Sequence, residues 1–204
     1  MEEGESCIKS IRNCAARNIG KIVVKRIMED LLANNYRDVL DVLEINIDFS
    51  NFQNYYGLYI APKENGGAFI GGVMPVGLAF REDFNEVIRG SLAHELAHAA
   101  LKHHKISEDN LSSILYCIGR DKKLDESLRY LPVSVKKEAL KKIGDACFAR
   151  IEHSTDEEVI RRGLGLELYM GRVFCEDFRR QNDGSVQPEY YTSLEIAELV
   201  KRTL

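Results

Sequence analysis

Two histidines and a glutamate in the segment 94–98 (His94-Glu95-Leu96-Ala97-His98) could do chemistry together if that segment is helical. Residues four positions apart on an α-helix lie on one face, so both imidazoles can reach one zinc ion. Glu95 lies about 100° further around the helix than His94, which leaves its carboxylate free to act on a water molecule. Zinc lowers the pKa of a bound water to about 7, and a nearby carboxylate can then take its proton. The pattern therefore predicts metal-assisted hydrolysis, with His94 and His98 as zinc ligands and Glu95 as the general base.

The residues around this pattern favour a site over a chance arrangement on an exposed helix. They are small and apolar, namely Ala93, Leu96, Ala97, Ala99 and Ala100. Such a helix is expected to be buried, and buried imidazoles and a buried carboxylate are costly without a partner. A metal ion would supply that partner.

A catalytic zinc needs a third protein ligand and one open position. His103 lies nine residues after His94, about 2.5 helical turns, and is therefore expected on the far side of the same helix. For His103 and His104 we expect a role as cations at a helix C-terminus, where they complement the helix dipole.

Acidic residues further along the chain are better candidates for the third ligand. Asp156, Glu157 and Glu158 begin a predicted helix whose remainder is apolar on nearly all sides, which is typical of a buried helix. Periodicity alone does not choose between Glu157 and Glu158. The alternative is ordinary, because acidic residues are favoured in the first turn of any helix.

His153 directly precedes this acidic segment and could lie near the metal. There it could donate a proton or stabilise an oxyanion late in the reaction. The alternative is a histidine at the surface or at a helix cap.

The segment 92–98, together with Gly77-Leu78 before it and His103 after it, resembles the metal-binding helix of the HtpX-like zinc peptidases. That family is of gluzincin type and is related to the CAAX prenyl proteases. Its pattern is a strand ending in Gly-Leu, then HELxH, then another histidine five residues later. The resemblance covers about residues 70–170 and implies a zincin-like fold and peptide-bond hydrolysis.

The second motif of that family is a glutamate ligand followed by Ala-Asp and, on a later helix, Gly-Leu. The segment 153–158 followed by Gly165-Leu166 resembles it. On this match Glu158 is the zinc-binding glutamate, and Glu157 is the alternative by a shift of one residue. Arg161-Arg162 then take the place of the Ala-Asp pair, whose aspartate organises the site in that family.

A second resemblance is to the ImmA/IrrE type of cytosolic peptidase, which cleaves repressors. The segment 89–104 is similar to its metal-binding helix, and Leu168-Tyr169-Met170 is similar to its Leu-Leu-Met. This match also places the later glutamate on Glu158. Both resemblances imply the same metal, the same ligands and the same reaction.

The composition excludes several other classes of protein. With 204 residues, 45% of them hydrophobic, the chain suits one domain, and a net charge of −4 argues against nucleic-acid binding. No apolar stretch is long enough for a membrane span, and the acidic N-terminus lacks the apolar core of a secretion signal. The cysteines are odd in number and form no CxxC pair. We therefore expect a reduced, cytoplasmic protein whose partner is a protein or peptide substrate.

The hydrophobic periodicity predicts an α+β fold with helices first, then a small sheet, then helices. Strands are expected at 43–49, 55–60 and 68–74, in a mainly antiparallel sheet of about three strands because the connections are short. Residues 68–74 could also hold an extended substrate by main-chain hydrogen bonds, and the alternative is a strand buried by its neighbours. Helices are expected at 6–34, 83–105, 107–118, 134–151, 155–174 and 193–203, with a loop at 176–191.

These elements are expected to form one zincin-like domain over residues 1–204. It comprises an N-terminal helical segment (1–36), the sheet with the HExxH helix (42–104) and a helical part that supplies the third ligand (105–204). We expect a zinc-dependent endopeptidase. The alternative is a binding or regulatory module that keeps the fold and the zinc but has no activity, and the arginines at 161 and 162 motivate it.

Overall fold

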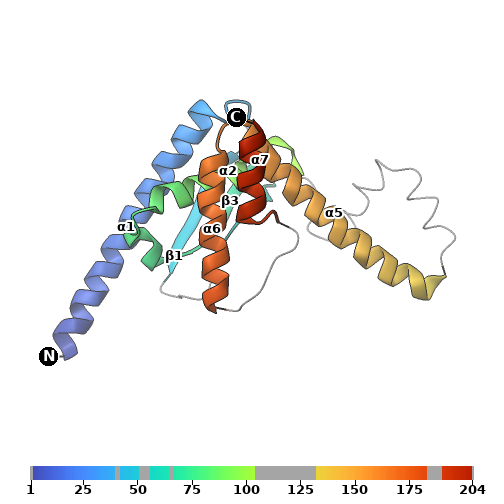
Figure 1. Cartoon of the computed structure of the whole chain (residues 1–204). Helices are drawn as coiled ribbons and strands as arrows, with labels where there is room; N and C mark the ends of the chain where they lie inside the picture. The colour runs from blue at the N-terminus through green and yellow to red at the C-terminus, as the bar shows by residue number, and fades with distance from the viewer. Residues whose placement is uncertain are drawn as a thin grey trace.

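The computed structural model describes residues 2–39, 42–50, 56–64, 67–103, 132–182 and 190–203. Within these ranges the chain forms a three-stranded sheet and five α-helices, which confirms the predicted α+β class. The order along the chain is a long helix, the sheet, the helix with the HExxH pattern and then three more helices (Figure 1). The predicted helix at 107–118 and His104 lie outside the described residues.

The sheet consists of β1 (Val42–Ser50), β2 (Gly57–Pro62) and β3 (Ala68–Pro75) in the order β1-β3-β2. β2 and β3 form an antiparallel hairpin, whereas β1 and β3 are parallel. The sheet is therefore mixed, and the expectation of a mainly antiparallel sheet was wrong. Short connections make successive strands run in opposite directions but do not make them neighbours. β3 takes the central place because it is the most buried strand, with Ile70 and Met74 fully enclosed.

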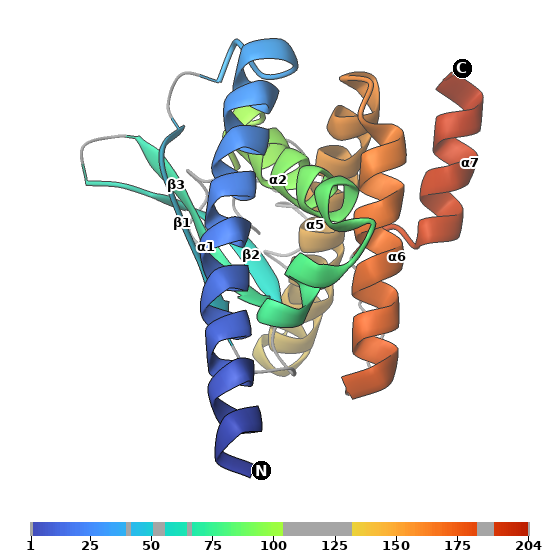
Figure 2. The same cartoon turned by 90° about the vertical axis from the view of Figure 1, so that its left-hand side faces the viewer.

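Two helices cover one face of this sheet. Helix α1 (Glu2–Asn34) packs through Val24, Met28 and Leu31 into the same core as β1 and β3, in the predicted position. Helix α2 (Phe84–Ala100) follows β3 through the short 3₁₀ helix η1 (Val76–Phe80). Figure 2 shows α2 between the sheet and the later helices, so nearly all of its sides are enclosed.

The C-terminal part contains α5 (Val133–Arg161), α6 (Gly165–Asn182) and α7 (Ser193–Thr203). The helix break predicted at 151–155 is wrong, because α5 runs unbroken through these residues. It ends in a Schellman turn: Gly163 has φ of +81°, its N–H donates to Ile160 O, and the Leu164 N–H donates to Val159 O. Gly163 is thus the residue that separates α5 from α6.

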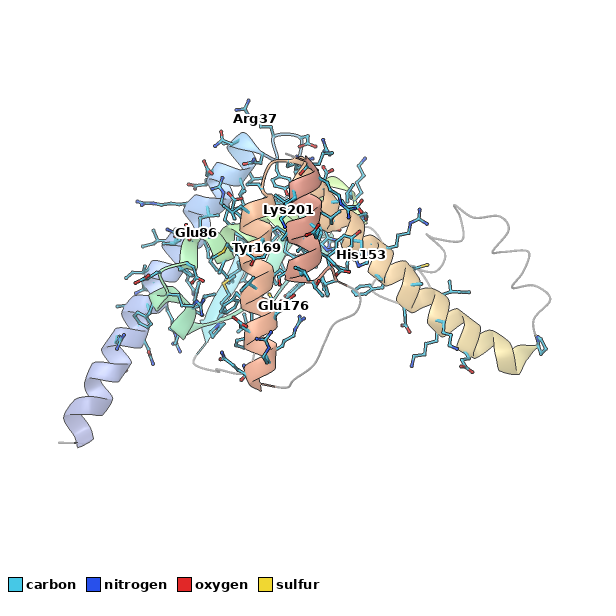
Figure 3. The ribbon with its side chains drawn as sticks, viewed as in Figure 1. Arg37, Glu86, His153, Tyr169, Glu176 and Lys201 are labelled. Atoms are coloured by element: carbon cyan, nitrogen blue, oxygen red, sulfur yellow. The ribbon has the colours of Figure 1, made fainter. Side chains whose placement is uncertain are left out.

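Helix α6 extends to Asn182, beyond the end at 174 that the sequence predicts, and it packs closely on α2. Gly90 on α2 permits this approach, since a Cβ there would lie 2.0 Å from the carbonyl oxygen of Glu167. Glu176 of α6, labelled in Figure 3, accepts hydrogen bonds from the backbone and the hydroxyl of Ser193 at the start of α7. Among the described residues, no helix is both long and apolar enough to cross a membrane.

Candidate metal centre

Three buried side chains converge between α2 and α5. The Nε2 atoms of His94 and His98 lie 3.1 Å apart, and Glu152 Oε2 lies 3.0 Å from the first and 3.3 Å from the second. All three residues are at most 9% exposed. Such a buried His-His-Glu cluster could hold a metal ion.

The helices explain why these side chains meet. His94 and His98 lie one turn apart on α2, as the HExxH spacing predicts. On α5, the positions 152, 155, 156 and 159 share one face, and all four residues are buried. This face of α5 is turned toward the histidines of α2, and Glu152 is the member nearest to both imidazoles.

A second layer of contacts orients His94. Its Nδ1 donates to Asp156 Oδ1 at 2.8 Å, and Arg172 of α6 binds both oxygens of the same carboxylate at 3.1 and 2.9 Å. The Asp156 carboxylate thus accepts hydrogen bonds from both the Arg172 guanidinium and the Nδ1–H of His94. In the neutral imidazole this hydrogen bond leaves the lone pair of Nε2 directed toward His98 and Glu152.

His98 is oriented in a similar way. The hydroxyl of Thr155 donates to the carbonyl of Ile151 at 2.8 Å, so its oxygen can accept from an imidazole, and His98 Nδ1 at 3.2 Å and His103 Nδ1 at 3.1 Å are both within reach. His103 also reaches this point, since its Nδ1 lies 3.1 Å from His98 Nδ1. The expectation that His103 points to the far side was wrong, because α2 ends first and Lys102 adopts a φ of 61°, which turns His103 back.

Glu95 lies beside the cluster and lines a cavity of about 250 Å³ together with His94. It is 8% exposed. Burial raises the pKa of the Glu95 carboxyl, partly offset by the nearby histidines. A carboxylate with a raised pKa next to an open cavity is a stronger proton acceptor than an exposed one.

The structure does not bring Glu158 to the histidines. Six residues after Glu152, it lies about 240° further around α5 and leaves the cluster's side of the helix. Its carboxylate accepts from Arg161 and Arg162, at 2.6 Å from Arg161 Nε and 2.7 Å from Arg162 Nε. Glu152 therefore replaces Glu158 as the candidate third ligand.

Glu157 and His153 also lie elsewhere. Glu157 is exposed and accepts a hydrogen bond from the Tyr191 hydroxyl at 3.0 Å. His153, labelled on α5 in Figure 3, stacks on the Tyr191 ring at a centroid distance of 3.8 Å. Neither residue lines the cavity beside Glu95, where instead Tyr190 forms part of the wall.

The arginines that follow Glu158 have a structural role at the end of α5. Arg162 binds Asp38 through two hydrogen bonds of 2.7 and 2.8 Å and lies over the ring of Tyr36, whose hydroxyl donates to Ala93 O at 2.7 Å. This contact ties the end of α1 to α2 directly before His94. Arg161 and Arg162 thus lie away from the histidines, and the aspartate that contacts His94 is Asp156.

The contact between Arg162 and Asp38 predicts a loss of stability in acid. The hydrogen bonds to Arg162 lower the pKa of Asp38 to about 2, and Arg161 and Arg162 also lower that of Glu158. A carboxylate with a lowered pKa stabilises the fold above its unfolded pKa, and this stabilisation is lost as the pH falls from about 4 to about 2. Thermal unfolding should show a smaller decrease in Tm over this interval for Arg162→Met than for wild type. The same change at the exposed Arg150 should leave the decrease unaltered.

A sequence signal for Glu152 existed. Glu152 is followed by Thr155-Asp156, so a glutamate, a small residue and an aspartate share one helical face, as in the glutamate and Ala-Asp motif described above. The predicted helix break at 151–155 separated Glu152 from Asp156 and concealed this pattern. An unbroken helix up to Gly163 would have revealed it.

Comparisons with known proteins add no relative to this picture. No family model matches the chain, and neither a curated protein nor a solved structure matches it.

Proposed function

We propose that the protein is a zinc-dependent peptidase whose metal ligands are His94, His98 and Glu152. One observation supports this above all. The Nε2 atoms of His94 and His98 and Oε2 of Glu152 lie within 3.3 Å of one another in a buried position, and in the tautomers that donate through Nδ1 all three atoms present lone pairs to one another. Electron-rich atoms this close repel unless a cation lies between them.

The donor set fits zinc. Catalytic zinc sites combine three protein ligands drawn from His and Asp or Glu with one open position. A tetrahedral ion with bonds of about 2.0–2.1 Å has ligand atoms about 3.3–3.4 Å apart. The observed separations of 3.0, 3.1 and 3.3 Å are close to that value and need only small side-chain shifts. When bound, the ion would polarise a carbonyl group and acidify a water molecule.

Glu95 is the proposed general base. Its carboxylate lies on the same helix as both histidines, is buried and faces the cavity that His94 also lines. Taking a proton from water there and passing it to the leaving nitrogen is the role that the HExxH spacing predicts.

Tyr190 is a second candidate for a direct role, in place of His153. The centroids of its ring and the His94 ring lie 5.9 Å apart. The guanidinium of Arg172 lies over the Tyr190 ring, 4.5 Å from its centroid. Burial raises the pKa of Tyr190 far above its ordinary value, so the hydroxyl keeps its proton. A neutral hydroxyl in the cavity wall can donate to the oxygen of a substrate carbonyl.

The substrate strand is best placed on β2. β3 is paired on both sides, so residues 68–74 have no free edge for a substrate, and that expectation was wrong. β2 pairs with β3 on one side only among the described residues, and its residues Gly57 and Leu58 line the cavity. An extended peptide added to β2 would therefore lie beside His94 and Glu95.

A metal-free ion cluster is the competing proposal. Burial lowers the pKa of His94, but the hydrogen bonds to Asp156 and Glu152 outweigh it and raise the pKa to about 10. A protonated His94 between two carboxylates would also satisfy the cluster. In that case the protein would be a binding module with no need of Glu95.

Zinc analysis of the purified full-length chain decides between the two. We expect about one zinc per chain by elemental analysis, and hydrolysis of an unfolded protein substrate that a chelator abolishes and added zinc restores. If the Kd for zinc is about 1,000-fold lower than the free zinc concentration, removal of zinc should lower the Tm by on the order of 10 °C. A chain that binds no zinc at micromolar concentration supports the ion cluster and contradicts the proposal.

A further inference from the structure

The wall that α6 contributes to the cavity carries positive charge. Its residues form one stripe along the helix at intervals of three or four, namely Leu168, Gly171, Arg172, Cys175 and Arg179. The two arginines are seven positions apart, hence on the same face and about two turns from each other. Among the described residues that line the cavity, Glu95 is the only acidic one.

The two arginines differ in how their charge is balanced. Arg172 is 9% exposed and is paired with Asp156, although its buried Nε has no hydrogen-bond partner among the residues that the structure describes. Arg179 is half-buried, and no carboxylate within the described ranges forms an ion pair with it. Its neighbour Arg180, by contrast, points to solvent and pairs with Asp177 at 3.1 Å. Arg179 is thus the cation of the cavity wall whose charge is not compensated.

The opposite wall leaves room for a side chain of moderate length. On α2 the cavity is bordered by the small side chain of Ser91, and Leu58 of β2 and Leu168 of α6 contribute apolar surface to it. A volume of about 250 Å³ is below that of pockets for drug-sized ligands, so it suits one residue of a longer chain.

We propose that this cavity is a specificity pocket for a carboxylate-bearing residue of the substrate, held by Arg179 next to His94 and Glu95. The inference rests on the proposed function and extends it to the class of substrate. The carboxylate comes either from an Asp or Glu side chain or from the C-terminus of a peptide. The planar guanidinium of Arg179 can bind either of them through two parallel hydrogen bonds.

A large apolar side chain is the competing occupant. It would cover Leu58 and Leu168 but would also remove water from Arg179 without supplying an acceptor. Leaving a charged donor buried and unpaired costs more than the apolar contact returns. A carboxylate with a short aliphatic stem satisfies both parts of the pocket.

Mapping of cleavage sites tests the proposal in the active protein. A mixture of peptides is digested and the product ends are identified by mass spectrometry. We expect Asp, Glu or a free C-terminus at one fixed position beside the cleaved bond, a preference that Arg179→Met removes and Arg179→Glu converts into one for Lys and Arg. The matched change Arg180→Glu should leave the preference intact. Cleavage without any acidic preference, unchanged in the Arg179 variants, overturns the inference while the proposed function stands.

Binding without turnover separates the two proposals. Metal-free wild-type protein is titrated with two pairs of labelled peptides. In one pair a Glu is replaced by Gln, and in the other a free C-terminus is replaced by an amidated one. We expect about 10-fold tighter binding of the carboxylate that is recognised, lost in Arg179→Met and kept in Arg180→Glu. Comparison of the Glu and Gln peptides, and of the free and amidated C-termini, shows which carboxylate binds in the pocket. Carboxylate-selective binding in a chain that never cleaves contradicts the peptidase but supports the pocket, and equal binding of all the peptides overturns the pocket.

Discussion

Replacement of Glu95 by Gln is expected to reduce peptide hydrolysis by about 100- to 10,000-fold while zinc remains bound. Gln has nearly the same shape as Glu but cannot accept a proton from water. Glu95 is not among the three clustered residues that could hold a metal ion, so metal content should be unchanged. Initial rates on an unfolded protein substrate and elemental analysis of the same samples give both quantities.

The control for this variant is Glu86→Gln on the same helix. Glu86, labelled in Figure 3, is exposed in the first turn of α2 and does not line the cavity. The rate of Glu86→Gln should equal that of wild type. If Glu95→Gln retains full activity with zinc bound, Glu95 is not the general base, and the reaction must use another group.

The second large effect concerns the third ligand. Glu152→Gln is expected to weaken zinc binding by more than about 100-fold, because it removes the carboxylate that completes the cluster of described residues. Asp156→Asn, which only orients His94, should cost about 10- to 100-fold. Glu158→Gln should leave zinc affinity unchanged, since its carboxylate binds Arg161 and Arg162 instead. Competition against a chromophoric chelator measures the three affinities on one scale.

The stability of these variants provides an independent comparison. Glu158→Gln removes an acceptor from the buried side of Arg162 and should lower the Tm although zinc is retained. The opposite order, in which Glu158→Gln loses zinc and Glu152→Gln keeps it, would show that α5 is rotated when the metal is bound. The assignment of Glu152 would then be wrong.

The part of the site that lies on one helix could be predicted from the sequence. The positions of His94, Glu95 and His98 relative to one another follow from the pitch of an α-helix, so the local pattern was sufficient. The class of the fold and the approximate places of β1, β2, β3 and α2 were likewise predictable from periodicity, because each element shows its buried face in its own sequence.

Contacts between distant elements were decided only by the tertiary structure. Glu152 meets His94 across 58 positions of sequence, and its selection over Glu158 depends on the rotation of α5 about its own axis. That rotation is set by packing against α2 and by the Schellman turn at Gly163. The position of the His103 side chain depends in the same way on where α2 ends and on the positive φ of Lys102 that follows.

The order of the strands is a further example. Three short strands with short connections are compatible with more than one order, and burial of β3 on both sides selects the observed one. This choice determines that β2, and not β3, has an edge available beside Glu95. The sequence by itself thus determined the chemistry of one helix. Tertiary packing decided the third ligand, the cavity and its arginines, because side chains far apart in sequence meet only when whole helices and strands pack.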